Sequence, residues 1–354
     1  MKRSFNTYAN LLLVVILLST FNACQNKEGA SASEGNNIPT RTIKWKSEKD
    51  FQIKDIVKET QYIPLEDTEN SLFSAIDKLI IKGDRIYLLD ITGPKSLLVF
   101  DITGKFLHRV GRQGNGPGEY AHFINFDVLD NGIVSLYDQS KRRMMIYDAD
   151  GNYIQSIKSS YSFNDFCRLS DNYYLLALDV YEKNNNKRKI SLTKDLKHVE
   201  KSYFYFSDDY KNDRQNTRVF QPYKDDIAYM LPVASDTLFI FDRQGTIQQT
   251  YFFDFGNQKL PEKLKNSYEE IINKRRQGVY YTYVFNTPIL IRDYIFAIIF
   301  MENQKYIAVF DRVNNTSTYE ALTPENFSTE HVNFPLYAIN DSIIISYIDL
   351  LLMR

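Results

Sequence analysis

An apolar residue, an aromatic residue and an aspartate recur together along this chain, just before turn-forming sequence. The clearest copies span residues 99–104, 146–151, 240–245 and 309–314, and a weaker copy spans 192–195. Their aspartates, from Asp101 to Asp311, are separated by 47, 47, 47 and 69 residues. A repeat of this length, built from short strands and tight turns, is typical of the blades of a β-propeller.

Each repeat divides into four short strands, a to d. In the first repeat they are predicted at 76–81, 85–90, 96–101 and 106–110, with Gly and Asp in the hairpins that need a positive φ. The scheme continues along the chain until only two strands of a last repeat can be placed. The sequence therefore predicts an all-β fold, a six-bladed β-propeller over residues 41–354 whose last blade is incomplete.

Closure of the predicted ring depends on the segment that precedes the first repeat. Residues 59–65 alternate like a strand, and we expect them to close the last blade as its outer strand. One further strand of that blade is either lacking or supplied by Ile43–Lys46.

The longer step of 69 residues between Asp242 and Asp311 predicts an insertion. Leu260, Leu264 and Ile271 recur at helical spacing, and the segment 261–277 starts with a proline, which suits a first helical turn. We expect one short amphipathic helix here, inserted between blades 4 and 5.

The start of the chain predicts export. A basic pair is followed by an apolar stretch at 11–18 that is too short to span a bilayer, and Phe21-Asn22-Ala23-Cys24 resembles a bacterial lipobox. We expect residues 1–23 to be a lipoprotein signal peptide, Cys24 to carry the lipid, and 24–40 to be a flexible tether. The predicted location is the bacterial cell envelope, on the periplasmic side or at the outer-membrane surface. An ordinary secretory signal with an incidental cysteine is the alternative.

Composition limits the classes of function. The formal net charge is −1, and no basic stripe suggests nucleic acid as a partner. Besides Cys24 the chain has one cysteine, Cys167, so an internal disulfide framework is excluded and a packed, buried thiol is expected. The four histidines lack ligand spacing, and no nucleophile motif occurs.

A glycine-rich segment, residues 111–120, connects the first two repeats. Together with the aromatic-aspartate turns and the segment 253–256, its Gly-Pro-Gly-Glu-Tyr core resembles the six-bladed β-propeller lipoproteins of gut-type bacteria, distant relatives of NHL-repeat propellers. The resemblance covers residues 40–354 and implies a fold and an envelope location, with little function attached. A phosphate loop is not favoured, because no Lys-Ser/Thr follows and no helix begins there.

The candidate ligand-binding residues lie in loops predicted to share one face, the channel mouth formed by the d–a and b–c connections. They are Arg112, Gln113, Glu119, Lys141, Arg142 and Tyr181. Arginine forks suit planar anions, and an exposed tyrosine can stack on a sugar ring. The alternative for the glycines is a tight crossover that has no room for a Cβ, and for the charged loop a solvated surface.

Strand b of several repeats ends in aspartate, as at Asp90 and Asp138. Carboxylates around one mouth could coordinate Ca²⁺. Aspartates in such positions also cap the following turn through backbone N–H groups, which is the favoured interpretation. We therefore expect no cofactor, with calcium as the alternative.

The sequence favours a binding or interaction module over an enzyme. The expected ligand is a glycan, a peptide or another envelope protein, bound at the channel mouth while the lipid holds the protein at the membrane. The alternative is a metal-assisted hydrolase, lactonase or lyase of the six-bladed propeller type, because propellers support many chemistries.

Overall fold

The structure, a computed structural model, describes residues 38–45, 59, 61–170, 173–211, 218–321, 332–340 and 343–348. All of them belong to one compact unit, Asn36–Arg354. The predicted signal peptide, Cys24 and most of the tether lie outside the described residues. None of the described helices is long and apolar enough to cross a bilayer.

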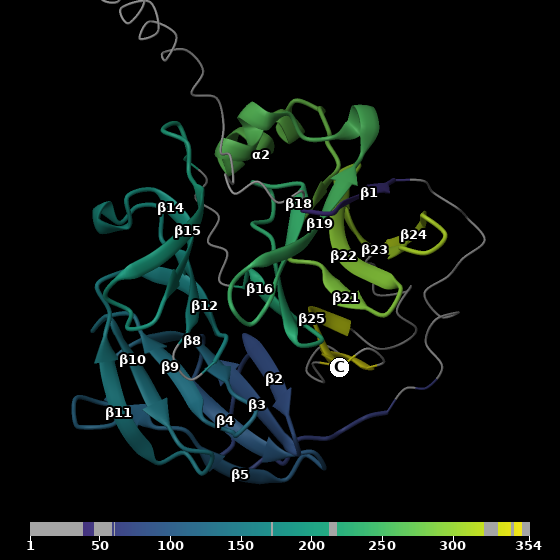
Figure 1. The fold of residues 1–354 in the computed structure, drawn as a ribbon. Coiled ribbons are helices and arrows are strands. Elements are labelled where there is room, and N and C mark those ends of the chain that lie inside the picture. Colours follow the sequence, from purple (N-terminus) through teal and green to yellow (C-terminus); the bar gives the residue numbers. More distant parts are fainter. Residues whose placement is uncertain are drawn as a thin grey trace, which may run out of the picture. The chain divides into compact units, whose positions relative to one another are not determined.

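Five antiparallel blades follow one another in chain order (Figure 1). Blade 1 contains β2 (Lys78–Lys82), β3 (Arg85–Asp90), β4 (Ser96–Asp101) and β5 (Phe106–Arg109). Blade 2 contains β8 (Phe123–Val128), β9 (Val134–Asp138), β10 (Arg143–Tyr147) and β11 (Tyr153–Lys158). Blade 3 contains β12 (Phe163–Arg168), β13 (Tyr174–Leu178), β14 (Arg188–Thr193) and β15 (Val199–Tyr205).

The next two blades carry additional strands. Blade 4 contains β16 (Phe220–Tyr223), β17 (Asp226–Tyr229), β18 (Thr237–Phe241) and β19 (Ile247–Asp254), and β1 (Thr40–Lys44) is added to its outer edge. Blade 5 contains β20 (Tyr283–Val284), β21 (Ile289–Ile291), β22 (Tyr294–Met301), β23 (Gln304–Asp311) and β24 (Thr316–Ala321). Two short strands, β6 (Arg112–Gln113) and β7 (Glu119–Tyr120), pair within the first crossover.

The all-β propeller is confirmed, but the predicted count of six blades is wrong. Beyond Ala321 the described chain adds only a two-stranded ladder, β25 (Val332–Asn340) and β26 (Ile343–Ile348), and two strands do not make a blade. The innermost strands contact each other in the order β2, β8, β12, β16 and β21, and β25 lies against both β21 and β2. This ladder therefore occupies the gap between the fifth blade and the first.

The expected closing strand is not formed. Within the predicted segment 59–65, the described residues have no strand assignment, although Ile63 and Leu65 pack against the apolar cluster of blade 1, beside Ile345. The other candidate is Ile43–Lys46. Its first two residues belong to β1, and Lys46 lies outside the described residues. Strand β1 runs parallel to β19 and pairs Thr40 with Thr250 and Lys44 with Asp254. It extends blade 4 rather than a last blade, because its apolar side chain Ile43 fits the core between blades 4 and 5.

The recurring aspartate has a structural explanation. Asp101 Oδ1 accepts hydrogen bonds from Thr103 N at 2.8 Å and Lys105 N at 3.1 Å. Asp148 and Asp242 do the same in the equivalent turns of blades 2 and 4. Each carboxylate thus holds the turn between strands c and d, a role that a short acidic side chain performs well.

The apolar core lies mainly between blades. One cluster joins blades 1 and 2 through Tyr87, Val99 and Phe126, and a separate cluster joins blades 4 and 5 through Leu238, Phe253 and Phe310. Large rings on facing sheets therefore supply the packing between neighbours.

The inserted helix is confirmed in position and is shorter than expected. A 3₁₀ turn, η4 (Glu262–Asn266), precedes α2 (Tyr268–Arg276). Ser267 separates the two because its side chain caps α2, accepting a hydrogen bond from Glu270 N at 3.3 Å. Leu264 and Ile271 pack on Phe300 of blade 5, so the insertion lies against the propeller.

Candidate functional site

The glycine-rich crossover folds back on its own glutamate. Glu119 Oε2 accepts a hydrogen bond from Gly116 N at 2.7 Å, and its Oε1 accepts one from Arg112 Nε at 2.6 Å. These two contacts, the backbone N–H first, lower the pKa of Glu119. A Cβ at Gly114 would collide with that carboxylate, and Gly118 has a φ of +73°. The glycines therefore serve the turn, as the simpler interpretation held.

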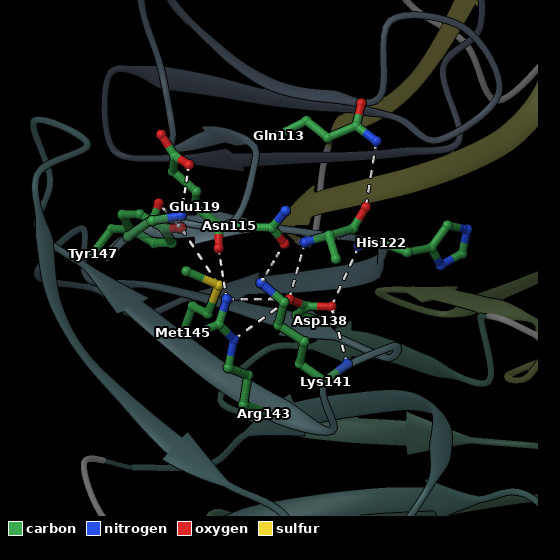
Figure 2. Close-up of polar contacts among 12 residues, drawn as sticks. Gln113, Asn115, Glu119, His122, Asp138, Lys141, Arg143, Met145 and Tyr147 are labelled. Carbon is green, nitrogen blue, oxygen red and sulfur yellow. Dashed lines mark hydrogen bonds and ion pairs between the residues drawn. The ribbon is translucent and has the colours of Figure 1, made fainter.

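The b–c loop of blade 2 lies beside this crossover (Figure 2). Lys141 Nζ donates to Asn115 Oδ1 at 3.3 Å, and the Arg143 guanidinium donates to the Glu119 carbonyl at 2.6 Å. Gln113 Nε2 donates to the Ala121 carbonyl at 3.4 Å. The structure thus brings four predicted residues together, Arg112, Gln113, Glu119 and Lys141. Arg112 and Glu119 bond to each other, whereas Gln113 and Lys141 bond to other groups in or next to the crossover.

The other two predicted residues lie toward blade 3. Arg142 donates to Glu182 Oε1 at 2.8 Å, which directs it away from the crossover. Tyr181 precedes Glu182 in the b–c loop of blade 3 and its side chain is 65% exposed. These residues form a second, separate part of the same face.

The two candidate calcium ligands are both fully buried at the ends of their b strands. Asp90 accepts hydrogen bonds from Ser74 N at 2.6 Å and Gly93 N at 2.7 Å. Asp138 accepts hydrogen bonds from Ala121 N at 3.1 Å and His122 N at 3.3 Å. Both carboxylates hold neighbouring loops. Within the described part of the chain, no cluster of three or more His, Cys, Asp or Glu side chains could hold a metal.

A cavity of about 90 Å³ lies among the inner strands of blades 1 to 4. Its lining includes side chains from β2, β8, β12 and β16, with Ile345 from β26. Most of the lining residues stand near the carboxyl ends of these inner strands, where strand a turns into strand b. The predicted loops lie at the opposite ends of the same strands. The cavity therefore lies on the face opposite to the one that carries the predicted ligand-binding residues.

Buried polar groups tie the four blades together around this cavity. Lys78 Nζ donates to Asn125 Oδ1 at 2.8 Å and lies 3.9 Å from Asp165 Oδ1. Asp165 Oδ2 in turn accepts hydrogen bonds from Val219 N at 2.7 Å and Phe220 N at 3.0 Å. Strands β2, β8 and β12 and the start of β16 are thus linked by one chain of polar contacts.

Burial changes the acid–base properties of this region. It raises the pKa of Asp165, of Asp127 and of the Cys167 thiol, against the opposing effect of the Lys78 charge. Cys167 is only 5% exposed and lines the cavity, so the expectation of a packed thiol is confirmed. A thiol with a raised pKa is a weak nucleophile.

The lining is rich in cations that the sequence interpretation did not select. They are Lys78, Lys82, Arg168, Arg218 and Arg243. The available signal was the presence of charged residues inside strands that otherwise read as buried, and an arginine directly after the repeated aspartate, at Asp242-Arg243 and again at Asp311-Arg312. Only the arrangement of the blades determines which of these charged side chains face the propeller axis.

Comparison with known proteins gives the family. The model described as "Domain of unknown function (DUF4934)" matches residues 36–349, and the chain belongs to that family. The comparison with curated proteins found no match.

Solved structures share the fold. A crystal structure named "Putative exported protein", from Bacteroides fragilis NCTC 9343, is similar with a TM-score of 0.68 at 16% identity, over 84% of this chain and 85% of that one. A DUF4221 member from Bacteroides vulgatus ATCC 8482 has a TM-score of 0.48 at 12% identity, covering 73% and 84%. Streptogramin B lyase has a TM-score of 0.44 at 12% identity, covering 76% and 75%. At these identities the likeness concerns the fold alone.

Proposed function

We propose that this protein is an exported binding module whose ligand occupies the axial cavity. The observation that carries the proposal is the cavity itself, which four blades line with both charged and apolar side chains. Concave sites of mixed polarity between repeated elements are where propellers and other scaffolds usually hold small ligands. The neutral, packed Cys167 suits a surface that binds rather than reacts.

Export and anchoring form part of the same proposal. The basic start, the short apolar stretch and Cys24 support a lipid-held protein of the bacterial envelope. The name of the similar Bacteroides fragilis protein agrees with export. The kinship to NHL-type propellers inferred from the glycine-rich segment remains a prediction.

The opposite face remains a proposed contact surface for a larger partner, such as a glycan, a peptide or an envelope protein. Tyr181 is exposed there, and the Arg142–Glu182 ion pair holds the adjacent loops of blades 2 and 3 together. Arg112 is 78% exposed at its side chain and extends the same face.

Ligand binding in the cavity is tested with a substitution that fills the cavity. The full chain is screened by thermal shift against neutral sugars, sugar acids, peptides and small organic acids. At least one class should raise the melting temperature. The rise should disappear in Cys167→Met, whose longer side chain fills the cavity, and persist in Cys167→Ala, which leaves it open.

Two outcomes would contradict this proposal. One is that every rise observed survives Cys167→Met and is lost in Arg112→Ala, which would place all binding on the opposite face. The other is the absence of any rise across the four classes.

A further inference from the structure

The size of the axial cavity restricts what can enter it. A cavity of about 150 Å³ holds benzene, so about 90 Å³ corresponds to roughly four non-hydrogen atoms. Drug-sized ligands need pockets of about 300 Å³ or more. A whole oligosaccharide or peptide is therefore too large, and the occupant is a small molecule.

The charges of the lining residues further restrict the class of small molecule that can bind. Five of the lining residues are cationic and one, Asp127, is acidic. Asp165 and Asp130 add two carboxylates nearby, at 3.9 Å from Lys78 Nζ and 2.6 Å from Lys82 Nζ. Asp226, whose carboxyl interacts electrostatically with Arg243, is a fourth carboxylate, so cationic groups still outnumber carboxylates, five to four. A concave site with this balance concentrates anions.

The acidic residue of the lining, Asp127, does not prevent an anion from binding. Asp127 Oδ1 accepts a hydrogen bond from Val128 N at 2.9 Å, and Oδ2 accepts one from Arg168 N at 2.6 Å. Both oxygens thus face backbone dipoles that offset the negative charge.

Arg243 offers the most direct contact for an anion. It stands in the c–d turn of blade 4, and its Nε donates to the Asp225 carbonyl at 2.5 Å. That bond fixes the side chain from one edge of the guanidinium. The opposite edge carries the paired N–H groups that suit a planar, two-oxygen acceptor. Among the described residues, no carboxylate lies within ion-pair distance of Arg243.

Most of the remaining lining is apolar. Leu79, Ile80, Phe166, Ile227 and Ile345 contribute alkyl or aromatic surface to the cavity. A fully hydrated oxyanion such as sulfate gains nothing from these groups and loses its water. An anion with a short hydrocarbon tail satisfies both parts of the lining.

We propose that the axial cavity binds a short-chain carboxylate, with its carboxylate at Arg243 and its alkyl tail against the apolar lining. This deepens the proposed function and rests on it. The class comprises acids of about the size of acetate or propionate, held by their carboxylate and by a methyl or ethyl group.

The test uses the full chain and isothermal titration calorimetry at constant ionic strength, with sodium chloride replacing the probe salt in the reference. The probes are propionate, the neutral isostere propionamide, and sulfate. We expect saturable binding of propionate, at least tenfold weaker binding of propionamide, and no saturable binding of sulfate. Arg243→Gln should weaken propionate binding about 10- to 100-fold, because a charge-assisted hydrogen bond is lost.

Arg112→Gln is the matched control, since it removes the same charge from the opposite face and should leave propionate binding unchanged. If Arg243→Gln does not fold, Lys82→Gln at the same end of the cavity replaces it, with an expected loss of several-fold. Equal binding of propionate and propionamide, or an equal loss in Arg112→Gln, overturns the inference.

The two proposals fail in different ways. If propionate does not bind while another class from the thermal-shift screen binds in a manner sensitive to Cys167→Met, the carboxylate assignment is wrong and the binding module stands. If no class binds, both are wrong.

Discussion

At the scale of single residues, Asp165 is the side chain on which most blades depend. It is fully buried, and its carboxylate accepts hydrogen bonds from backbone N–H groups of blades 3 and 4 and from the Asn125 amide of blade 2. Lys78 of blade 1 supplies the nearest positive charge. The sequence analysis did not select this residue, because its partners lie about 40 to 55 positions away.

Asp165→Ala should lower the free energy of unfolding by about 3–5 kcal/mol, because it leaves the buried N–H groups of Val219 and Phe220 without their acceptor and removes the carboxylate next to Lys78. Urea denaturation followed by circular dichroism measures the change. Asp208→Ala is the control, since Asp208 is 94% exposed at its side chain and pairs with Lys187 at the surface. A loss below about 1 kcal/mol for Asp165→Ala would show that the carboxylate does not connect the blades.

Arg243 illustrates a different limit of sequence reasoning. It stands inside the repeat that defined the fold, yet its counterpart in blade 5, Arg312, donates to the hydroxyls of Tyr223 and Tyr251. Two arginines in equivalent turns thus have different surroundings. Both turns share the sequence Phe-Asp-Arg, and the contacts with the neighbouring blade distinguish the two arginines.

At the scale of elements, the c–d turns are the part of the fold that the sequence predicts best. Every acceptor contact of Asp101 and Asp148 within its turn reaches a group no more than four residues away. Such local contacts can be inferred from the order of residues alone. The short strands flanking these turns were accordingly placed within a few residues of their observed bounds.

These turns should make the fold sensitive to acid. The Thr103 hydroxyl is the main cause that lowers the pKa of Asp101, and the Asn152 amide lowers that of Asp148. A folded pKa below the unfolded one means that the unfolded chain takes up protons first. The stabilisation is therefore present above about pH 4 and is lost as pH falls through the lower, folded values.

The double variant Asp101→Asn/Asp148→Asn tests this, because an asparagine oxygen still accepts the N–H bonds but does not titrate. Melting temperatures measured between pH 6 and pH 3 should fall less steeply for the variant than for the unmodified chain. Parallel curves for the two proteins would contradict the assignment of acid sensitivity to these turns.

At the scale of the whole molecule, contacts between residues far apart in the chain determine features that the sequence alone does not predict. Strand β1 pairs with residues about 210 positions later, and no local pattern announces that partner. The same limit explains the blade count, since the position of the β25–β26 ladder depends on its contacts with β21 and β2. The cavity belongs to this scale as well, because four inner strands create it.

Trp45, just after β1, packs against Phe255, Phe310 and Tyr319, with ring centroids 5.9, 5.8 and 5.1 Å away. Trp45→Ala should therefore lower the free energy of unfolding by about 3 kcal/mol. This value is at the low end for the loss of a large ring, because Trp45 is only half-buried. Since Trp45 is the only tryptophan, its fluorescence reports directly on its packing against these three rings. In the unmodified chain its emission should shift at the same urea concentration at which circular dichroism is lost. An earlier shift would mean that β1 detaches before the blades unfold.

The parallel pairing of β1 with β19 also has a mechanical consequence. A pull on the chain from the amino side of Thr40, directed along the strand, loads all five paired residues of the ladder at once, from Thr40–Thr250 to Lys44–Asp254. Bonds that share a load in this way must break together, whereas bonds at a peeled edge break one by one. Blade 4 would then bear tension arriving from that side, and the first blade, although it comes next in the chain, would be shielded from it.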